Sequence, residues 1–179
     1  MSNDESNNQS LLHKQAIHEV LLRFARGIDR CDLQLLKTVF WEDCVVDYGK
    51  LGGAAWEFFT TVLSTRSETD VTHHQITNVL IELNRNKAQV ESYVTAHHFV
   101  KEEGKDMDMT AGGRYLDTFE QRNTEWRIVK RLFIMDWNQN VESTARWDTG
   151  LHAQFTHHGA HFPEDILYKQ FTKKKLDSN

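Results

Sequence analysis

The N-terminal part of the chain carries apolar residues at helical spacing. Between residues 10 and 29 they recur every three or four positions, which predicts an amphipathic helix over that range. The apolar stripe consists of Ile17, Leu21, Phe24 and Ile28. Residues 1–9 are polar and show no periodicity, so we expect a disordered lead-in before the helix.

Two shorter helices and a short strand are predicted next. Asp32 can cap a helix over residues 32–40, and a further apolar row indicates a third helix over residues 54–65. Between these helices, residues 44–48 favour a short strand, which ends at the glycines that follow. The N-terminal half is therefore expected to be mainly helical.

Strand signals dominate after residue 70. Four long stretches rich in Val, Ile, Tyr and Phe, joined by polar turns, cover residues 72–83, 87–101, 107–121 and 126–138. Helices followed by consecutive strands predict an α+β fold, with a curved mixed or antiparallel sheet wrapped around the N-terminal helices and an internal pocket. We expect the sheet to bend at Gly112 and Gly113.

The C-terminal part has a different character. Residues 10–140 form one predicted domain, and residues 141–179 form an extension. The extension is too apolar for a free tail, since it carries Trp147, Leu151, Phe155, Phe162, Ile166 and Leu167. We expect it to pack on the domain or on a neighbouring subunit.

Charge and composition argue against several classes of protein. A formal charge of −5 and an isoelectric point near 6.0 give no basic face for nucleic acid. The polar N-terminus is unlike a signal peptide, and no apolar run reaches the roughly 18 residues that span a membrane. We therefore expect a cytoplasmic protein without membrane contact. Two cysteines are too few for a disulfide framework, whereas ten Phe, five Trp and four Tyr can line an apolar cavity.

A carboxylate and an imidazole are the first candidates for chemistry. Asp29 ends the first helix beside its apolar stripe, where an unpaired carboxylate is costly. Strand alternation places His74 on one face with Ile76, Asn78 and Leu80, a mixed row suited to a partly polar cavity. A neutral imidazole there can act as a general base. The alternative is that Asp29 faces water and His74 is a structural residue of the core.

Arg131 interrupts an apolar strand face. The same row contains Val129, Phe133, Met135 and Trp137. A buried guanidinium needs a carboxylate or an anionic ligand, because it cannot lose its charge. Arg131 is therefore expected either to form an ion pair with Asp117 or Asp29, or to stabilise negative charge on a substrate.

The other histidines give weaker signals. His97 and His98 point to opposite faces of a strand, and one of them is expected to lie opposite His74. His157 and His161 would share a face in a helix, but no carboxylate or cysteine follows at ligand spacing, so no metal site is predicted. The chain also lacks a glycine-rich phosphate loop, a nucleophile elbow and a CxxC motif, so no cofactor is predicted.

Several motifs occur in a familiar order. They are the helix end Phe24–Asp29, the segment Val39–Asp43, His74 four residues before Asn78, and the final-strand segment Trp126–Arg131. In this order they resemble the SnoaL-like family of the nuclear transport factor 2-like superfamily, over roughly residues 10–138. The resemblance implies a cone-shaped α+β barrel with a deep pocket.

The resemblance also implies a chemistry. Scytalone dehydratase, hexachlorocyclohexane dehydrochlorinase and the bile-acid dehydratases use a His–Asp pair without a cofactor. Asp29 and His74 match that pair, and Arg131 matches the arginine of the dehydrochlorinase. Phe24 departs from the pattern, since the relatives carry lysine or tyrosine there. The residues expected to contact substrate are Phe24, Trp41, Tyr48, His97, Tyr115, Phe133 and Trp137.

Two functions from different classes follow from the resemblance. The first is a cofactor-free lyase or isomerase of the dehydratase, dehydrohalogenase or ketosteroid-isomerase type, acting on a small hydrophobic and cyclic molecule. The alternative is a non-catalytic ligand-binding or assembly module, such as a protein similar to the β subunit of ring-hydroxylating dioxygenases. In either case the open sheet face is expected to form a homodimer or homotrimer.

Overall fold

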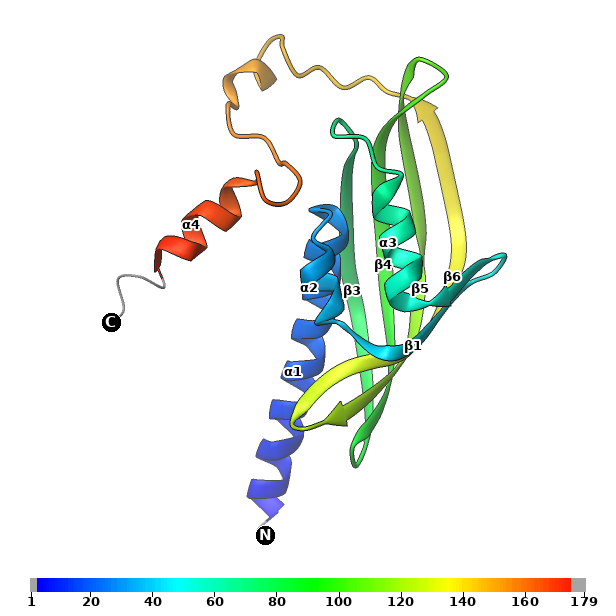
Figure 1. The fold of residues 1–179 in the computed structure, drawn as a ribbon, viewed down its shortest axis with the longest axis vertical. Helices are drawn as coiled ribbons and strands as arrows, with labels where there is room; N and C mark the ends of the chain where they lie inside the picture. Colours follow the sequence, from blue (N-terminus) through cyan, green and yellow to red (C-terminus); the bar gives the residue numbers. More distant parts are fainter. Residues whose placement is uncertain (1–2, 175–179) are drawn as a thin grey trace.

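The computed structural model describes residues 3–174 (Figure 1). The helices are α1 (Asn3–Asp29), α2 (Leu33–Lys37), α3 (Ala55–Ser64) and α4 (Ile166–Lys174), with a 3-10 turn at His152–Gln154. The strands are β1 (Phe40–Tyr48), β2 (Leu51–Ala54), β3 (Val71–Asn84), β4 (Lys87–Glu102), β5 (Lys105–Arg122) and β6 (Glu125–Glu142). None of the described helices is long and apolar enough to cross a membrane.

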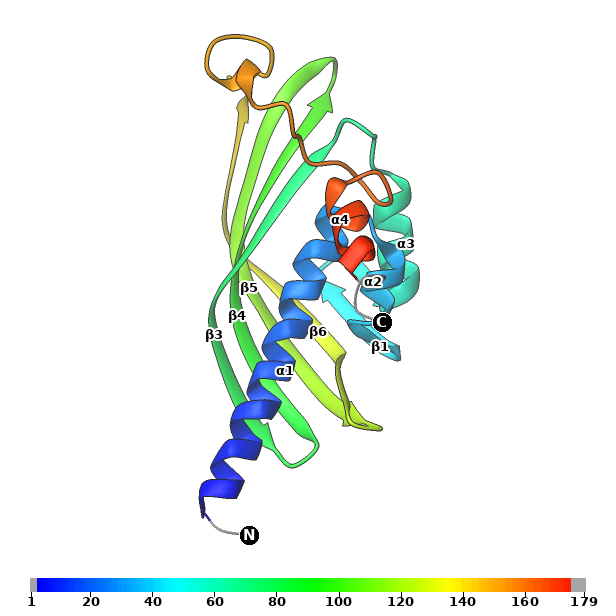
Figure 2. The ribbon, with the colours of Figure 1, turned by 90° about the vertical axis from the view of Figure 1, so that its left-hand side faces the viewer.

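All six strands form one curved sheet in the order β2-β1-β6-β5-β4-β3. Strand β1 runs parallel to β6, and every other pair is antiparallel, so the sheet is mixed. Figure 2 shows the curvature edge-on, with α1, α2 and α3 on the concave side. This is the predicted α+β cone.

The apolar stripe of α1 fills the concave side of the sheet. The buried residues of this stripe are Ile17, Val20, Leu21, Phe24 and Ile28. Fully burying side chains of this size stabilises the fold by about 1.5–3 kcal/mol each. This packing fixes where α1 ends, and therefore where Asp29 lies against β3.

Several element boundaries differ from the sequence-based expectation. Helix α1 already begins at Asn3, so residues 3–9 of the expected lead-in are helical, while residues 1–2 lie outside the described part. Helix α2 ends at Lys37, and the chain enters β1 at Phe40 because this residue pairs with β6. Strand β2 was not predicted, since Gly52 and Gly53 favoured a turn.

Irregular pairing shifts the faces of two strands. In β3 the register slips between Thr77 and Leu80, where Asn78 adopts a left-handed φ of 47°. Leu80 is therefore 59% exposed on the convex face and does not share the face of His74, contrary to the prediction. A second slip lies between Gly112 and Gly113, the glycine pair at which a bend was expected.

The chain returns across the sheet after β6. Residues 143–174, called the C-terminal strap below, leave β6, pass the upper end of the sheet and come back to the end of α1 (Figures 1 and 2). Phe162 N–H donates to the carbonyl of Arg30 at 2.6 Å. The extension therefore packs on its own domain in this structure; its last residues, 175–179, lie outside the described part.

Candidate functional site

Asp29 and His74 meet where α1 ends against the first half of β3. The Asp29 Oδ1 atom lies 2.7 Å from His74 Nδ1, and the two side chains are 10% and 8% exposed. The sequence brings them together because the apolar stripe of α1 packs on the concave face of the sheet, and His74 points to that face. The pair proposed from the sequence thus exists as a direct contact.

The Asp29 carboxylate accepts two further hydrogen bonds. The Thr72 hydroxyl donates to Oδ1 at 3.0 Å, and the backbone N–H of His74 donates to Oδ2 at 2.9 Å. Since the carboxylate accepts from Nδ1, the imidazole proton is placed on that nitrogen. No described residue hydrogen-bonds to His74 Nε2, which leaves this atom able to accept a proton.

His98 is the histidine that lies next to His74. Their rings contact edge-to-face at 5.6 Å between centroids. Burial, together with the charges of His74 and Arg66, lowers the pKa of His98 to about 4, so the ring is neutral near pH 7. His98 also lines a cavity of about 330 Å³ on the concave face, together with Met109, Thr110, Ala111, Met135, Asn138 and Asn140.

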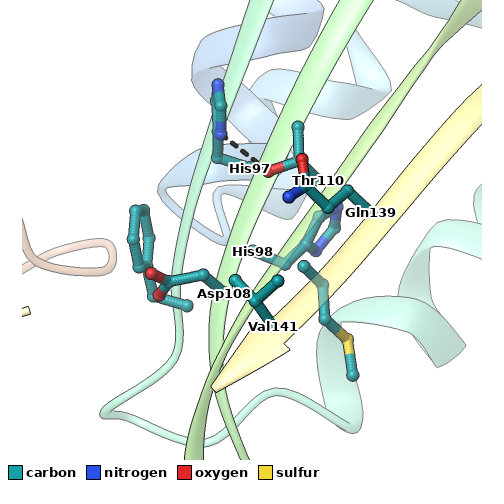
Figure 3. Close-up of a pocket in the computed structure, with 8 residues that line it drawn as sticks. His97, His98, Asp108, Thr110, Gln139 and Val141 are labelled. Atoms are coloured by element: carbon teal, nitrogen blue, oxygen red, sulfur yellow. Dashed lines mark hydrogen bonds between the residues drawn. The ribbon is translucent and has the colours of Figure 1, made fainter. Parts of the chain in front are cut away.

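His97, which was expected to line the pocket, lies on the opposite face of the sheet from His74. It pairs in register with His73, and its Nδ1 is 3.1 Å from the Thr110 hydroxyl. Figure 3 shows this hydrogen bond beside a cavity of about 220 Å³. Most residues lining that cavity belong to the convex face, including Asp108, Gln139 and Val141. His97 is therefore replaced by His98 as the partner of His74.

Arg131 is fully buried in an ion pair with Asp117. Its Nε and Nη2 atoms donate to the two carboxylate oxygens at 2.8 and 2.7 Å. Burial acts to lower the pKa of Arg131, but the Asp117 carboxylate outweighs it and raises that pKa. Of the two alternatives, the structure shows the ion pair, and Arg131 is 0% exposed.

Aromatic side chains cover the Arg131 guanidinium. The ring centres of Phe24 and Tyr115 both lie 4.0 Å from its central carbon. The Phe24 ring also meets the His74 ring edge-to-face at 6.3 Å, so it connects the ion pair to the histidine. Phe133 stacks on Tyr48 and lies against Tyr115. These four aromatics, which were expected to contact substrate, form a packed cluster that meets the dyad through Phe24.

The two predicted tryptophans lie away from the dyad. The Trp41 indole N–H donates to the carbonyl of Glu120, and Arg122 and Arg127 lie over its ring. Trp137 covers Gly112 on the convex face, because the register slip turns its side chain away from the row of Arg131. The sequence offered no signal for this slip except the glycine pair.

The C-terminal histidines do not form a helical pair. Residues 155–161 have no regular secondary structure, and His161 Nε2 donates to the carbonyl of Asp70 at 3.0 Å. Within residues 3–174, no group of three or more His, Cys, Asp or Glu side chains could hold a metal ion. Cys31 and Cys44 are both free thiols.

Comparison with known families agrees with this geometry. The SnoaL-like domain model matches residues 9–132, which is more than half of the chain. The chain belongs to the SnoaL-like family. The matched region contains Asp29, His74 and Arg131, whereas the C-terminal strap lies beyond it. Among curated proteins, no sequence matches this SnoaL-like protein.

Solved structures of the nuclear transport factor 2-like superfamily share the fold. A Novosphingobium aromaticivorans protein assigned provisionally as a scytalone dehydratase is 23% identical, with a TM-score of 0.64 over 78% of this chain and 93% of that one. A hexachlorocyclohexane dehydrochlorinase from Novosphingobium barchaimii is 17% identical, with a TM-score of 0.67 over 75% and 94%. At these identities the likeness establishes the cone-shaped fold of the SnoaL-like domain.

Proposed function

We propose that this SnoaL-like protein is a cofactor-free lyase or isomerase in which His74 is the general base. His74 Nε2 takes a proton from a substrate carbon, and the electron pair of that C–H bond either expels a neighbouring group or relocates to a carbonyl oxygen. Asp29 holds Nδ1–H and stabilises the imidazolium that forms. The proton then leaves to the departing group, to solvent or to a second carbon.

The Asp29–His74 hydrogen bond of 2.7 Å supports this proposal most directly. A histidine that acts as a base needs a fixed tautomer and one free ring nitrogen. The three hydrogen bonds that Asp29 accepts hold its carboxylate in place and so fix the tautomer of His74. General-base catalysis of this type contributes about 10²–10⁴-fold to a rate. Positioning and the electrostatics of the cavity must supply the rest.

The concave cavity indicates the class of substrate. Its walls combine the apolar side chains of Met109, Ala111 and Met135 with the amides of Asn138 and Asn140. Such a lining suits a small hydrophobic ring that carries one or two hydroxyl, carbonyl or halogen groups. His98 lines this cavity and its ring contacts the His74 ring, so a substrate bound there lies beside the neutral His98 ring.

The test is turnover of hydroxylated and halogenated cyclic compounds by the protein and by His74→Gln. We expect His74→Gln to lower kcat/KM by at least about 10²-fold, because the base is lost, with an unchanged melting temperature. His73→Gln is the matched control, since its neighbouring side chain points to the opposite face, and it should keep full activity. Full turnover by His74→Gln would exclude the proposal.

A non-catalytic ligand-binding module is the second candidate. It is favoured by one observation: His74 is 8% exposed, and the lining of the concave cavity includes His98 but not His74. A module of this kind would bind cyclic compounds without converting them. Equal binding by the unaltered protein and His74→Gln, with no turnover by either, would favour this candidate over the enzyme.

We further propose that the convex face forms a homodimer or homotrimer. Exposed apolar side chains from four strands gather on this face: Leu80, Tyr93, Leu116, Trp137 and Val141. Arg114 lies among them in ion pairs with Glu91 and Asp136, so opposite charges are available for a second copy. Apolar faces of this kind mark protein interfaces.

A further inference from the structure

The C-terminal strap is fastened to the residue that follows Asp29. Arg30 accepts a hydrogen bond from Phe162 N–H at its carbonyl, and its Nε lies 3.1 Å from Asp165 Oδ2. The strap also reaches Asp32, whose carboxylate interacts with the Tyr168 hydroxyl. These contacts fix the corner between α1 and α2, which carries the carboxylate half of the dyad.

The same strap is fastened to the start of β3. His161 Nε2 donates to the carbonyl of Asp70 at 3.0 Å. Two residues later, the Thr72 hydroxyl bonds to Asp29, and His74 follows on the same strand. The strap therefore bridges, from outside, the two chain segments that bring Asp29 and His74 together.

Asp165 organises this bridge. It is 5% exposed, and its carboxylate accepts from the backbone N–H groups of Ala160 and Leu167 at 3.0 and 2.9 Å, besides its pairing with Arg30. Burial acts to raise the pKa of Asp165, but these two hydrogen bonds and the charge of Arg30 hold the pKa below its usual value. One charged group thus shapes the turn of the strap and anchors it to the α1 corner.

We propose that the strap is a clamp that sets the geometry of the Asp29–His74 pair, with Asp165 as a positioning residue. Asp165 touches neither member of the pair and acts through Arg30 and the turn around Ala160. A displacement of about 1 Å at a reacting group can cost about 10²-fold in rate. The effect on rate rests on the proposed function, whereas the effect on the hydrogen bond of the pair does not.

The first test observes the hydrogen bond without any substrate. Imidazole ¹H–¹⁵N spectra of the full chain report the His74 Nδ1 proton, which His74→Gln assigns. We expect Asp165→Ala to shift and broaden this signal, and Asp165→Asn, whose single amide oxygen can still accept from one of the two N–H groups, to have a smaller effect. Glu164→Ala is the control, since Glu164 forms only an exposed ion pair with Lys169 on the same turn.

The second test measures turnover of the cyclic compounds. Asp165→Ala is expected to lower kcat by roughly tenfold to 100-fold with KM changed less than about threefold, because geometry and not substrate contact is altered. If Asp165→Ala does not fold, Asp165→Asn takes its place. A folded variant with an unchanged His74 signal and unchanged kcat would overturn the clamp. A changed signal in a chain that turns over no compound would uphold the clamp and reject the proposed enzyme.

Discussion

At the scale of single residues, the dyad depends on neighbours that fix its protons. Asp29 accepts bonds from Thr72 and from two nitrogens of His74, so its carboxylate has little freedom to rotate. His98 adds a neutral ring on the cavity side. Helix periodicity and strand alternation made Asp29 and His74 candidates, and the resemblance to the SnoaL-like family implied that they pair; the identity of their neighbour could not be predicted.

The low pKa of His98 predicts a loss of stability on acidification. Between pH 6.5 and about 4 the unfolded chain binds a proton at His98 that the folded chain does not, so unfolding becomes easier as the pH falls through this window. The loss is at most about 3 kcal/mol, since one pKa unit corresponds to about 1.4 kcal/mol. Urea unfolding at pH 7 and 4.5 measures it. Between these two pH values, His98→Gln should lose less stability than His73→Gln. Equal losses in the two variants would contradict the low pKa of His98.

At the scale of elements, irregular pairing decides which side chains share a face. The turn at Arg85 and Asn86 joins β3 to β4, and regular pairing counted from this turn would place His74 opposite His97. The slip near Asn78 shifts the register by one residue, so that His74 pairs with Ala96 instead and His98 shares its face. The positions of the strands follow from composition, but a one-residue slip reverses the face assigned to every side chain beyond it. The sequence alone therefore does not distinguish His97 from His98 as the neighbour of His74.

The parallel pairing of β1 with β6 is the other feature that local patterns miss. The partners Val46 and Arg131 are far apart in the sequence, and nothing in the apolar pattern of either segment specifies the other. Long-range pairing of this kind depends on the whole fold and not on local propensity. The helices and the four long strands, by contrast, follow from periodicity and turn residues.

The bend of the sheet gives a prediction at this scale. A Cβ at Gly113 would lie 2.2 Å from the backbone carbonyl oxygen of Ile134, which cannot move without distorting β6. A Cβ at Gly112 would meet the half-exposed indole of Trp137, which can swing away. Gly113→Ala should therefore destabilise the protein by about 1–3 kcal/mol in urea unfolding, and Gly112→Ala by less. The reverse order would contradict this view of the bend.

At the scale of the whole molecule, the proposed chemistry and the proposed association lie on opposite faces of the sheet. The concave face holds the dyad and the cavity beside His98, while the convex face exposes apolar side chains. The C-terminal strap contacts the end of α1 at Arg30 and the start of β3 at Asp70, away from Leu80, Tyr93 and Leu116. A second copy can bind there without blocking the dyad.

Association through the convex face is measured by light scattering after gel filtration. We expect two or three times the chain mass of 20.9 kDa for the unaltered protein. Leu116→Lys should shift the mass toward one chain, because a charge replaces an apolar contact. Leu11→Lys is the matched control, since Leu11 is also an exposed leucine but lies on α1. If Leu11→Lys lost association and Leu116→Lys did not, the interface would not lie on the convex face.

The role of His74 as a base for carbon acids is tested most directly by hydrogen exchange of cyclic ketones in D₂O. Proton NMR follows the loss of the signal from the acidic C–H, which requires no leaving group. The protein should accelerate this exchange, His73→Gln should match it, and His74→Gln and Asp29→Asn should each be slower by at least about 10²-fold. Exchange by His74→Gln at the rate of the unaltered protein would contradict the proposed chemistry.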